Sequence, residues 1–152
     1  NLSVIKSVIK SNKIRSDLLL KRVNLIMKNK INNKTISFLG VTFKANTDDM
    51  RDSSSLKLIP YLSKKGAKIK YYDPTGFKKE FENLKNTEFS NSINEAIKGS
   101  DLVIIHTEWN DFKSINFKKF SKNKKLIIYD MRNIFSPSKI KKLGLKYYGI
   151  GC

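Results

Sequence analysis

The sequence predicts an α/β fold, built as a doubly wound parallel sheet of about five to six strands behind a long N-terminal helix. From residue 35 onward, short apolar segments alternate with helical segments, as expected for strand–helix–strand units with right-handed crossovers. Several apolar segments are continuous, for example Val103-Ile104-Ile105. Continuous apolar runs are typical of strands that are buried on both faces of a parallel sheet.

The first predicted element is one long amphipathic helix. Between residues 2 and about 28, apolar residues recur mostly every three or four positions, Lys and Arg fill the gaps, and Gly and Pro are absent. A break near Ser11-Asn12 is an open alternative. Such a helix has more apolar surface than one small domain needs, so we expect it to pack on another domain or a second subunit. We therefore divide the chain into a linking and dimerisation helix, 1–30, and a sheet domain, 35–152.

The remaining elements follow from apolar runs and stop signals. Strands are predicted at 35–41, 68–72, 101–107 and 125–129, with a weaker one at 146–150 and a short one at 88–89. Helices are predicted at 54–65, 91–98, 116–121 and 137–143, three of them followed by a stop-signal glycine. Pro60 predicts a kink or a late start of its helix, and Ser136 is expected to cap the last helix. This element order describes a Rossmann-like domain.

Composition limits the class of protein. The 152 residues contain no apolar run near the ~20 residues of a membrane span. No secretory signal pattern is present, and because the chain starts at Asn1 rather than Met we expect a piece of a longer polypeptide. The single cysteine, Cys152, cannot form an internal disulfide, so a cytoplasmic protein is expected.

The formal charge of +18 raises the alternative of a basic nucleic-acid-binding module. Only four of the 31 basic residues are Arg, and the Lys residues are spread along the whole chain. Specific phosphate and base recognition relies on Arg, whereas dispersed Lys is typical of a solvated surface. We therefore expect no nucleic-acid partner.

The loop after the first strand is the strongest candidate for a binding site. Lys44 and Arg51 flank a polar turn that contains Asp48 and Asp49. Strand-to-helix junctions of α/β sheets bind anions, because helix N-termini present free N–H groups. A surface turn in which these four charges satisfy one another is the alternative. The loop lacks the G-x-G-x-x-G pattern of a pyrophosphate loop, since Gly40 stands alone.

A second cation follows another strand end. Arg132 comes directly after the strand at 125–129, and the carboxyl ends of parallel strands meet at one edge of the sheet. We therefore expect Lys44, Arg51 and Arg132 to converge along this edge as a clamp for phosphates. Pairing of Arg132 with Asp130 or Asp73 is the alternative.

Three further polar or aromatic residues near strand ends have simpler interpretations. Asp73 precedes a proline, which favours a turn over a contact with a ribose. Trp109 is expected in the core rather than stacked on a ligand base. His106 has no Cys or carboxylate at metal-ligand spacing, so no metal site is expected. No nucleophile with an activating base is recognisable either, so no catalytic residue is assigned.

These motifs together resemble a known family. Residues 39–53 (LGVTFKANTDDMRDS) are the most specific block, and 66–67 (GA), 72–74 (YDP), 107–109 (TEW), 130–134 (DMRNI) and 147–151 (YYGIG) follow in order. They are similar to the C-terminal, UDP-binding domain of the UDP-glucose 6-dehydrogenases, within the UDP-glucose/GDP-mannose dehydrogenase family. The segment 1–30 resembles the central helix that forms the dimer core in that family.

The resemblance implies roles for individual residues. Phe43, Lys44 and Arg132 are implied to bind the UDP-sugar, and Arg51 is implied to contact NAD that is bound mainly by another domain. Family members oxidise UDP-glucose to UDP-glucuronate with two NAD, through a cysteine nucleophile. Cys152 does not match that nucleophile, so the chain by itself is expected to be inactive. Met131 stands where the family commonly has Gly.

Three alternatives stay open at this point. The first is a UDP-N-acetyl-mannosamine or GDP-mannose dehydrogenase, the second is the nucleic-acid module, and the third is a dimerisation fragment with no ligand affinity.

Overall fold

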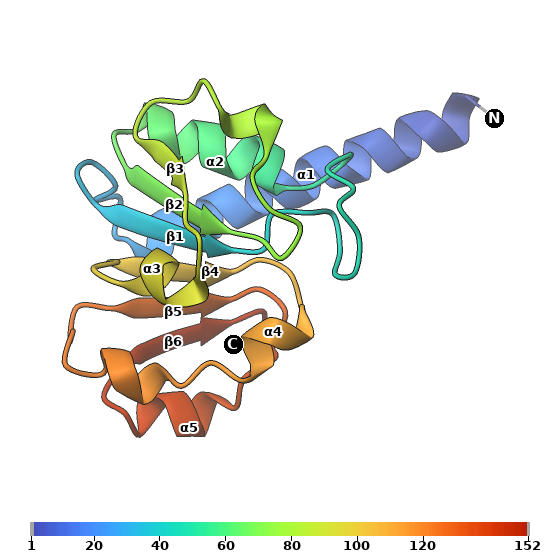
Figure 1. The fold of residues 1–152 in the computed structure, drawn as a ribbon. Helices are drawn as coiled ribbons and strands as arrows, with labels where there is room; N and C mark the ends of the chain where they lie inside the picture. The colour runs from blue at the N-terminus through green and yellow to red at the C-terminus, as the bar shows by residue number, and fades with distance from the viewer. Residues whose placement is uncertain (1, 152) are drawn as a thin grey trace.

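The computed structural model describes residues 2–151 and confirms the predicted α/β class (Figure 1). Six parallel strands form one sheet in the order β3-β2-β1-β4-β5-β6. Their bounds are β1 Thr35–Leu39, β2 Lys68–Tyr72, β3 Thr87–Phe89, β4 Leu102–Ile105, β5 Ile127–Asp130 and β6 Lys146–Gly149. The chain winds outward from β1 to β3 and then returns to β4 beside β1. The direction of winding therefore reverses between β1 and β4, where ligands bind in sheets of this kind.

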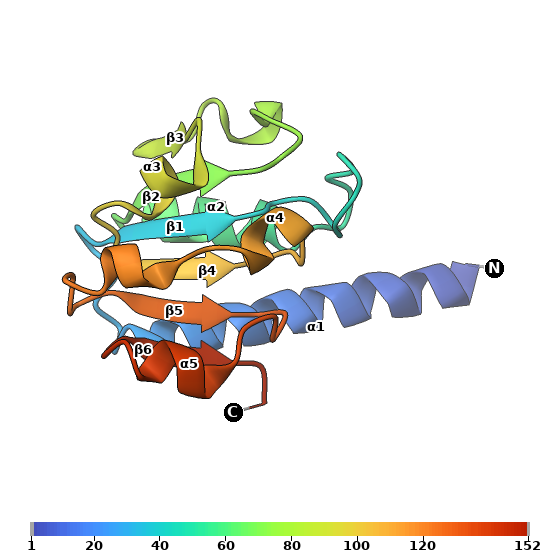
Figure 2. The ribbon, with the colours of Figure 1, turned by 60° about the horizontal axis from the view of Figure 1, so that its bottom comes forward.

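Helices cover both faces of the sheet, as the two views show (Figures 1 and 2). The long α1 (Leu2–Ile26) and α2 (Ser55–Lys64) pack on one face, while α3 (Ile93–Ile97), α4 (Asn110–Lys113) and α5 (Pro137–Lys141) pack on the other. Two short 3-10 helices, η1 (Lys79–Phe81) and η2 (Phe117–Phe120), lie in the connections. The two faces correspond to two separate clusters of buried apolar residues.

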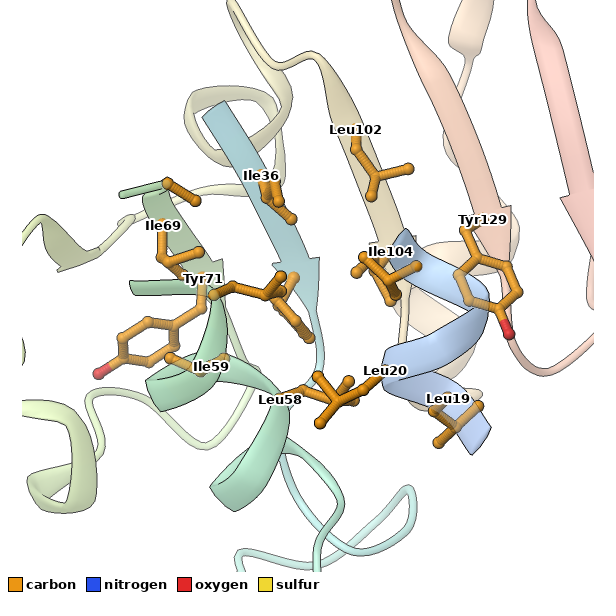
Figure 3. Packing of buried hydrophobic residues seen from close by; sticks show 14 of the residues in the cluster. Leu19, Leu20, Ile36, Leu58, Ile59, Ile69, Tyr71, Leu102, Ile104 and Tyr129 are labelled. Atoms are coloured by element: carbon orange, nitrogen blue, oxygen red, sulfur yellow. The ribbon is translucent and has the colours of Figure 1, made fainter. Parts of the chain in front are cut away.

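Alternation along the buried strands divides the core. In β4, Leu102 and Ile104 belong to the cluster under α1 and α2, whereas Val103 and Ile105 belong to the cluster on the opposite face. All four side chains are fully buried, as the continuous apolar run predicted. Figure 3 shows the first cluster, in which side chains of α1 and α2 meet those of the strands.

The first helix has two different halves. Leu19, Leu20 and Val23 are buried in the same core cluster as the sheet, but the N-terminal half projects beyond the domain with its apolar residues exposed (Figures 1 and 2). The exposed apolar residues of α1 are Leu2, Val4, Ile5, Val8, Ile9, Ile14, Leu18 and Leu25. The helix runs without interruption through Ser11-Asn12, so the alternative of a break there is wrong. The division of the chain at residues 30–35 stays a prediction.

Several predicted boundaries need correction. β1 ends at Leu39 because Gly40 has a φ of 80°, which extended backbone does not allow. α2 begins at Ser55 and continues through Pro60, so the late start does not occur. The predicted helix at 116–121 is the 3-10 helix η2, and both α4 and η1 were missed because single turns carry no periodic signal. Ser136 makes no capping hydrogen bond; its hydroxyl lies 3.1 Å from that of Ser138.

Within residues 2–151, no helix is long and apolar enough to cross a bilayer. In the same described part of the chain, no three His, Cys, Asp or Glu side chains are grouped to hold a metal ion. Cys152 lies outside the described residues.

Candidate functional site: a cation-lined pocket at the carboxyl edge of the sheet

The loops after β1 and β4 touch at the point where the winding reverses. An added Cβ on Gly40 would lie 1.6 Å from Oγ1 of Thr107, so only glycine permits this approach. The left-handed φ of Gly40 adds a second reason for glycine at this position. The space beside Gly40 is therefore filled by Thr107.

The loop after β1 is held by hydrogen bonds to the body of the domain. The backbone N–H of Val41 donates to the carboxylate of Asp73 at 2.8 Å, and the Val41 carbonyl accepts from the hydroxyls of Ser53 and Ser55, each at 2.6 Å. The Phe43 N–H donates to the Asp49 carbonyl across the loop at 2.9 Å. These contacts fix the backbone that carries Phe43 and Lys44.

Asp73 and Trp109 have the structural roles that the sequence favoured. The buried carboxylate of Asp73 also accepts hydrogen bonds from the N–H and the hydroxyl of Thr75, which makes it a turn residue. Trp109 is buried in the cluster under α3, α4 and α5. Neither side chain is therefore available to stack on or bind a ligand at the sheet edge.

Arg132 connects three strand ends. Its backbone N–H donates to Asp130, while its guanidinium donates to the His106 carbonyl at 2.9 Å and to the Phe43 carbonyl at 3.5 Å. Its Nε also lies 3.2 Å from a carboxylate oxygen of Glu108. The ion pair of its side chain is thus with Glu108, and of the predicted alternative pairing with Asp130 or Asp73 the structure has the hydrogen bond from the Arg132 backbone to Asp130. The Arg132 side chain stays 27% exposed.

One pocket gathers three of the four predicted site residues. Phe43, Lys44 and Arg132 line a hollow of about 210 Å³, together with residues from α1 and from the turn that precedes α2. The other lining residues are Asn12, Arg15, Ser16, Asp52 and Ser54. The expectation that Lys44 and Arg132 share one edge of the sheet is therefore realised in the geometry, between the sheet edge and α1.

Arg51 lies elsewhere. Its guanidinium forms two 3.0 Å hydrogen bonds with the carboxylate of Asp49, and its side chain is 88% exposed. The hydrogen bonds from Arg51 lower the pKa of Asp49. Arg51 lines a separate hollow of about 560 Å³ that also includes Phe77 and Lys79. The three cations therefore line two separate hollows rather than one common clamp, and among the described residues the predicted mutual pairing in the turn is seen for Arg51 and Asp49.

A buried histidine contacts one of the residues that line the first pocket. Nε2 of His106 is 2.7 Å from the hydroxyl of Ser54, which lines that pocket. The pKa of His106 is lowered from 6.5 to about 3, mainly by burial and then by the positive charges of Arg132 and Arg15, against an opposite effect of the Gly40 backbone. His106 is therefore neutral near pH 7.

Sequence reasoning missed the contribution of α1. Asn12, Arg15 and Ser16 were assigned only to a linking helix, because periodicity shows which face of a helix is apolar and not which loop its polar face meets. The rarity of Arg in this Lys-rich chain was the available signal, since Arg15 is one of four.

Comparison with known proteins places the chain in a family. The model for the UDP binding domain of the UDP-glucose/GDP-mannose dehydrogenase family matches residues 37–137. The chain belongs to the UDP-glucose/GDP-mannose dehydrogenase family. It is 36% identical to a UDP-glucose 6-dehydrogenase of Rickettsia prowazekii, over 97% of this chain and 35% of that protein. It is 34% identical to UDP-glucose 6-dehydrogenase YwqF of Bacillus subtilis, over 99% of this chain and 34% of that protein.

A solved structure gives the same arrangement of elements. A UDP-glucose dehydrogenase from the archaeon Pyrobaculum islandicum superposes with a TM-score of 0.73 at 20% identity, over 97% of this chain and 32% of that chain. This likeness supports the fold, including the long first helix. The chain spans about a third of the length of the curated relatives that it matches.

Proposed function

We propose that this chain is the UDP-sugar-binding, C-terminal part of a UDP-glucose 6-dehydrogenase, which oxidises UDP-glucose to UDP-glucuronate with two NAD. Membership of the family and the identity to UDP-glucose 6-dehydrogenases support the reaction class. The observation that carries the proposal is the pocket that Phe43, Lys44 and Arg132 line together beside the reversal of strand order.

The pocket residues suit a nucleotide sugar. Lys44 forms no ion pair with a carboxylate within residues 2–151, so its ammonium is available for a phosphate. Arg132 is held by the His106 carbonyl and Glu108 and stays partly exposed toward the pocket. Phe43 is 44% exposed beside these cations and offers an apolar surface to the ligand. Hydrogen bonds to charged groups contribute about 1.5–3 kcal/mol each.

NAD fits this chain only in part. Thr107 fills the space beside Gly40, so the residues at the strand reversal do not form a pyrophosphate loop. Arg51 is exposed and separate from the first pocket, which suits a contact with NAD held mainly by another domain. NAD accepts hydride in the proposed reaction, and this chain contributes only that contact.

The dimer and the compartment are part of the proposal. The exposed apolar residues in the N-terminal half of α1 support a homodimer through this helix. A single cysteine supports a cytoplasmic location.

No residue of this chain is assigned a catalytic role, so the chain alone is expected to bind the nucleotide without oxidising the sugar.

Calorimetric titration of the 152-residue chain with UDP tests the binding role. Both Arg132→Ala and Lys44→Ala are expected to raise the Kd for UDP by about tenfold or more, because each removes a charged hydrogen-bond donor. Lys44→Ala removes no observed ion pair, so its effect is separable from a loss of loop structure. Lys141→Ala, an exposed cation in α5, is the matched control.

Three results would contradict the proposal. Affinities for UDP that are equal in Lys44→Ala, Arg132→Ala and the control would remove the assigned roles. Tighter binding of UDP-N-acetyl-mannosamine or GDP-mannose than of UDP-glucose would favour those dehydrogenases. Salt-dependent binding of RNA or DNA that is tighter than binding of UDP would favour the nucleic-acid module.

A further inference from the structure

The first helix forms one wall of the pocket. Asn12, Arg15 and Ser16 lie on the α1 side, opposite the loop that carries Phe43 and Lys44. The resemblance to the family gave α1 a role in linking and dimerisation only. That role does not explain why α1 also lines this pocket.

Arg15 brings an uncompensated charge to this wall. Among residues 2–151, it forms no ion pair with a carboxylate, and the same is true of Lys44. Arg132 has Glu108 as its partner, and Asp52 is the acidic residue among those that line the pocket. Three cations therefore face a small space that holds one carboxylate, which favours an anionic occupant.

The size of the pocket limits which part of a ligand it takes. Ligand pockets that enclose a whole drug-sized molecule are about 300–1,000 Å³. The pocket here is about 210 Å³, so it fits the charged part of a nucleotide sugar rather than the whole molecule. With three cations around it, the matching group is the diphosphate, which offers several acceptor oxygens to guanidinium and ammonium groups.

The buried histidine gives independent support for the placement of Arg15. Both Arg132 and Arg15 act on the pKa of His106 in the same direction, by charge. His106 contacts Ser54, which lines the same pocket as Arg132, from the loop after β5, and Arg15, from α1. Arg15 therefore lies near enough to add to the field of the other two cations.

We propose that Arg15 of α1 binds the diphosphate of the nucleotide sugar together with Lys44 and Arg132. The proposal rests on the function proposed above and extends it, because the first helix becomes part of the binding site as well as of the core. An Arg on this helix couples ligand binding to the position of α1 on the sheet.

Titration of the 152-residue chain with UDP, UMP and uridine tests the proposal. Arg15→Ala is expected to raise the Kd for UDP by about tenfold or more, to affect UMP less, and to leave uridine unchanged. Arg15→Lys keeps the charge without the bidentate donor set and is expected to fall between the wild type and Arg15→Ala. Lys13→Ala is the matched control, because Lys13 is an exposed cation on the same helix that lies outside the pocket lining.

The outcomes separate this proposal from the function on which it rests. If Lys44→Ala weakens UDP but Arg15→Ala behaves like Lys13→Ala, the role of Arg15 is overturned while the proposed function stands. Equal weakening of UDP and uridine by Arg15→Ala would overturn the assignment to the diphosphate. A wild-type chain that does not bind UDP would refute the proposed function and this proposal with it. Urea unfolding of each variant checks that its substitution leaves the fold intact.

Discussion

Replacement of His106 by Gln is expected to remove a specific loss of stability in mild acid. His106 is 2% exposed, and its pKa falls from 6.5 to about 3 through burial first and then through Arg132 and Arg15. Above pH 6.5 the imidazole is neutral in both the folded and the unfolded chain. Below that pH the unfolded chain binds a proton that the folded chain does not accept until about pH 3, so stability falls as the pH falls.

The magnitude follows from the shift in pKa. Each unit corresponds to about 1.4 kcal/mol, so about 2 kcal/mol of unfolding free energy is lost at pH 5 relative to pH 7.5 through this one group. Gln cannot bind the proton, so the His106→Gln variant does not lose unfolding free energy in this way. The variant loses some packing, but it does so equally at every pH. The carboxylates that titrate in the same range are common to both proteins and cancel in the comparison.

Urea unfolding at pH 7.5 and pH 5, followed by the fluorescence of Trp109, measures this difference. Trp109 is the single tryptophan and is buried, so its emission reports unfolding of the domain. Between pH 7.5 and pH 5, the free energy of unfolding should fall by about 2 kcal/mol more for the wild type than for His106→Gln. An equal loss in both proteins would refute the argument, because it would mean that the folded state protonates His106 as readily as the unfolded chain does.

Two other substitutions test how the site is built. Gly40→Ala should destabilise the domain by about 2 kcal/mol or more in urea unfolding, because the new Cβ would overlap Thr107 and the φ of residue 40 is left-handed. Near-wild-type stability would show that the loops after β1 and β4 separate easily. Leu20→Ala should cost about 2–4 kcal/mol, whereas Leu18→Ala on the exposed side of α1 should change stability by less than ~0.5 kcal/mol. Similar costs for the two leucines would mean that α1 does not pack on the sheet as described.

Much of the fold was predictable because burial leaves a periodic pattern. The continuous run Val103-Ile104-Ile105 identified a strand enclosed on both faces, and glycines after helical segments marked where helices end. The missed elements, α4 and η1, are single turns fixed by local packing. The Rossmann-like class therefore followed from the sequence, whereas several exact ends did not.

The candidate site was predictable only to the level of the sheet edge. Parallel strands direct all their carboxyl ends to one side, so Lys44 and Arg132 could be placed together from their positions after strands. The same argument could not tell that Arg51 lines a different hollow from Lys44 and Arg132, because that depends on the path of the long loop after β1 and on Asp49, which binds this guanidinium.

The sequence by itself determined the class of the fold, the sheet edge that Lys44 and Arg132 share and the resemblance to a family, since these depend on residue type and order along the chain. The tertiary structure alone decided that α1 closes one side of the pocket with Arg15, and that Thr107 fills the space beside Gly40. Both depend on the distance between residues far apart in the chain. That distance is fixed by how helices pack on the sheet, and no local pattern encodes it.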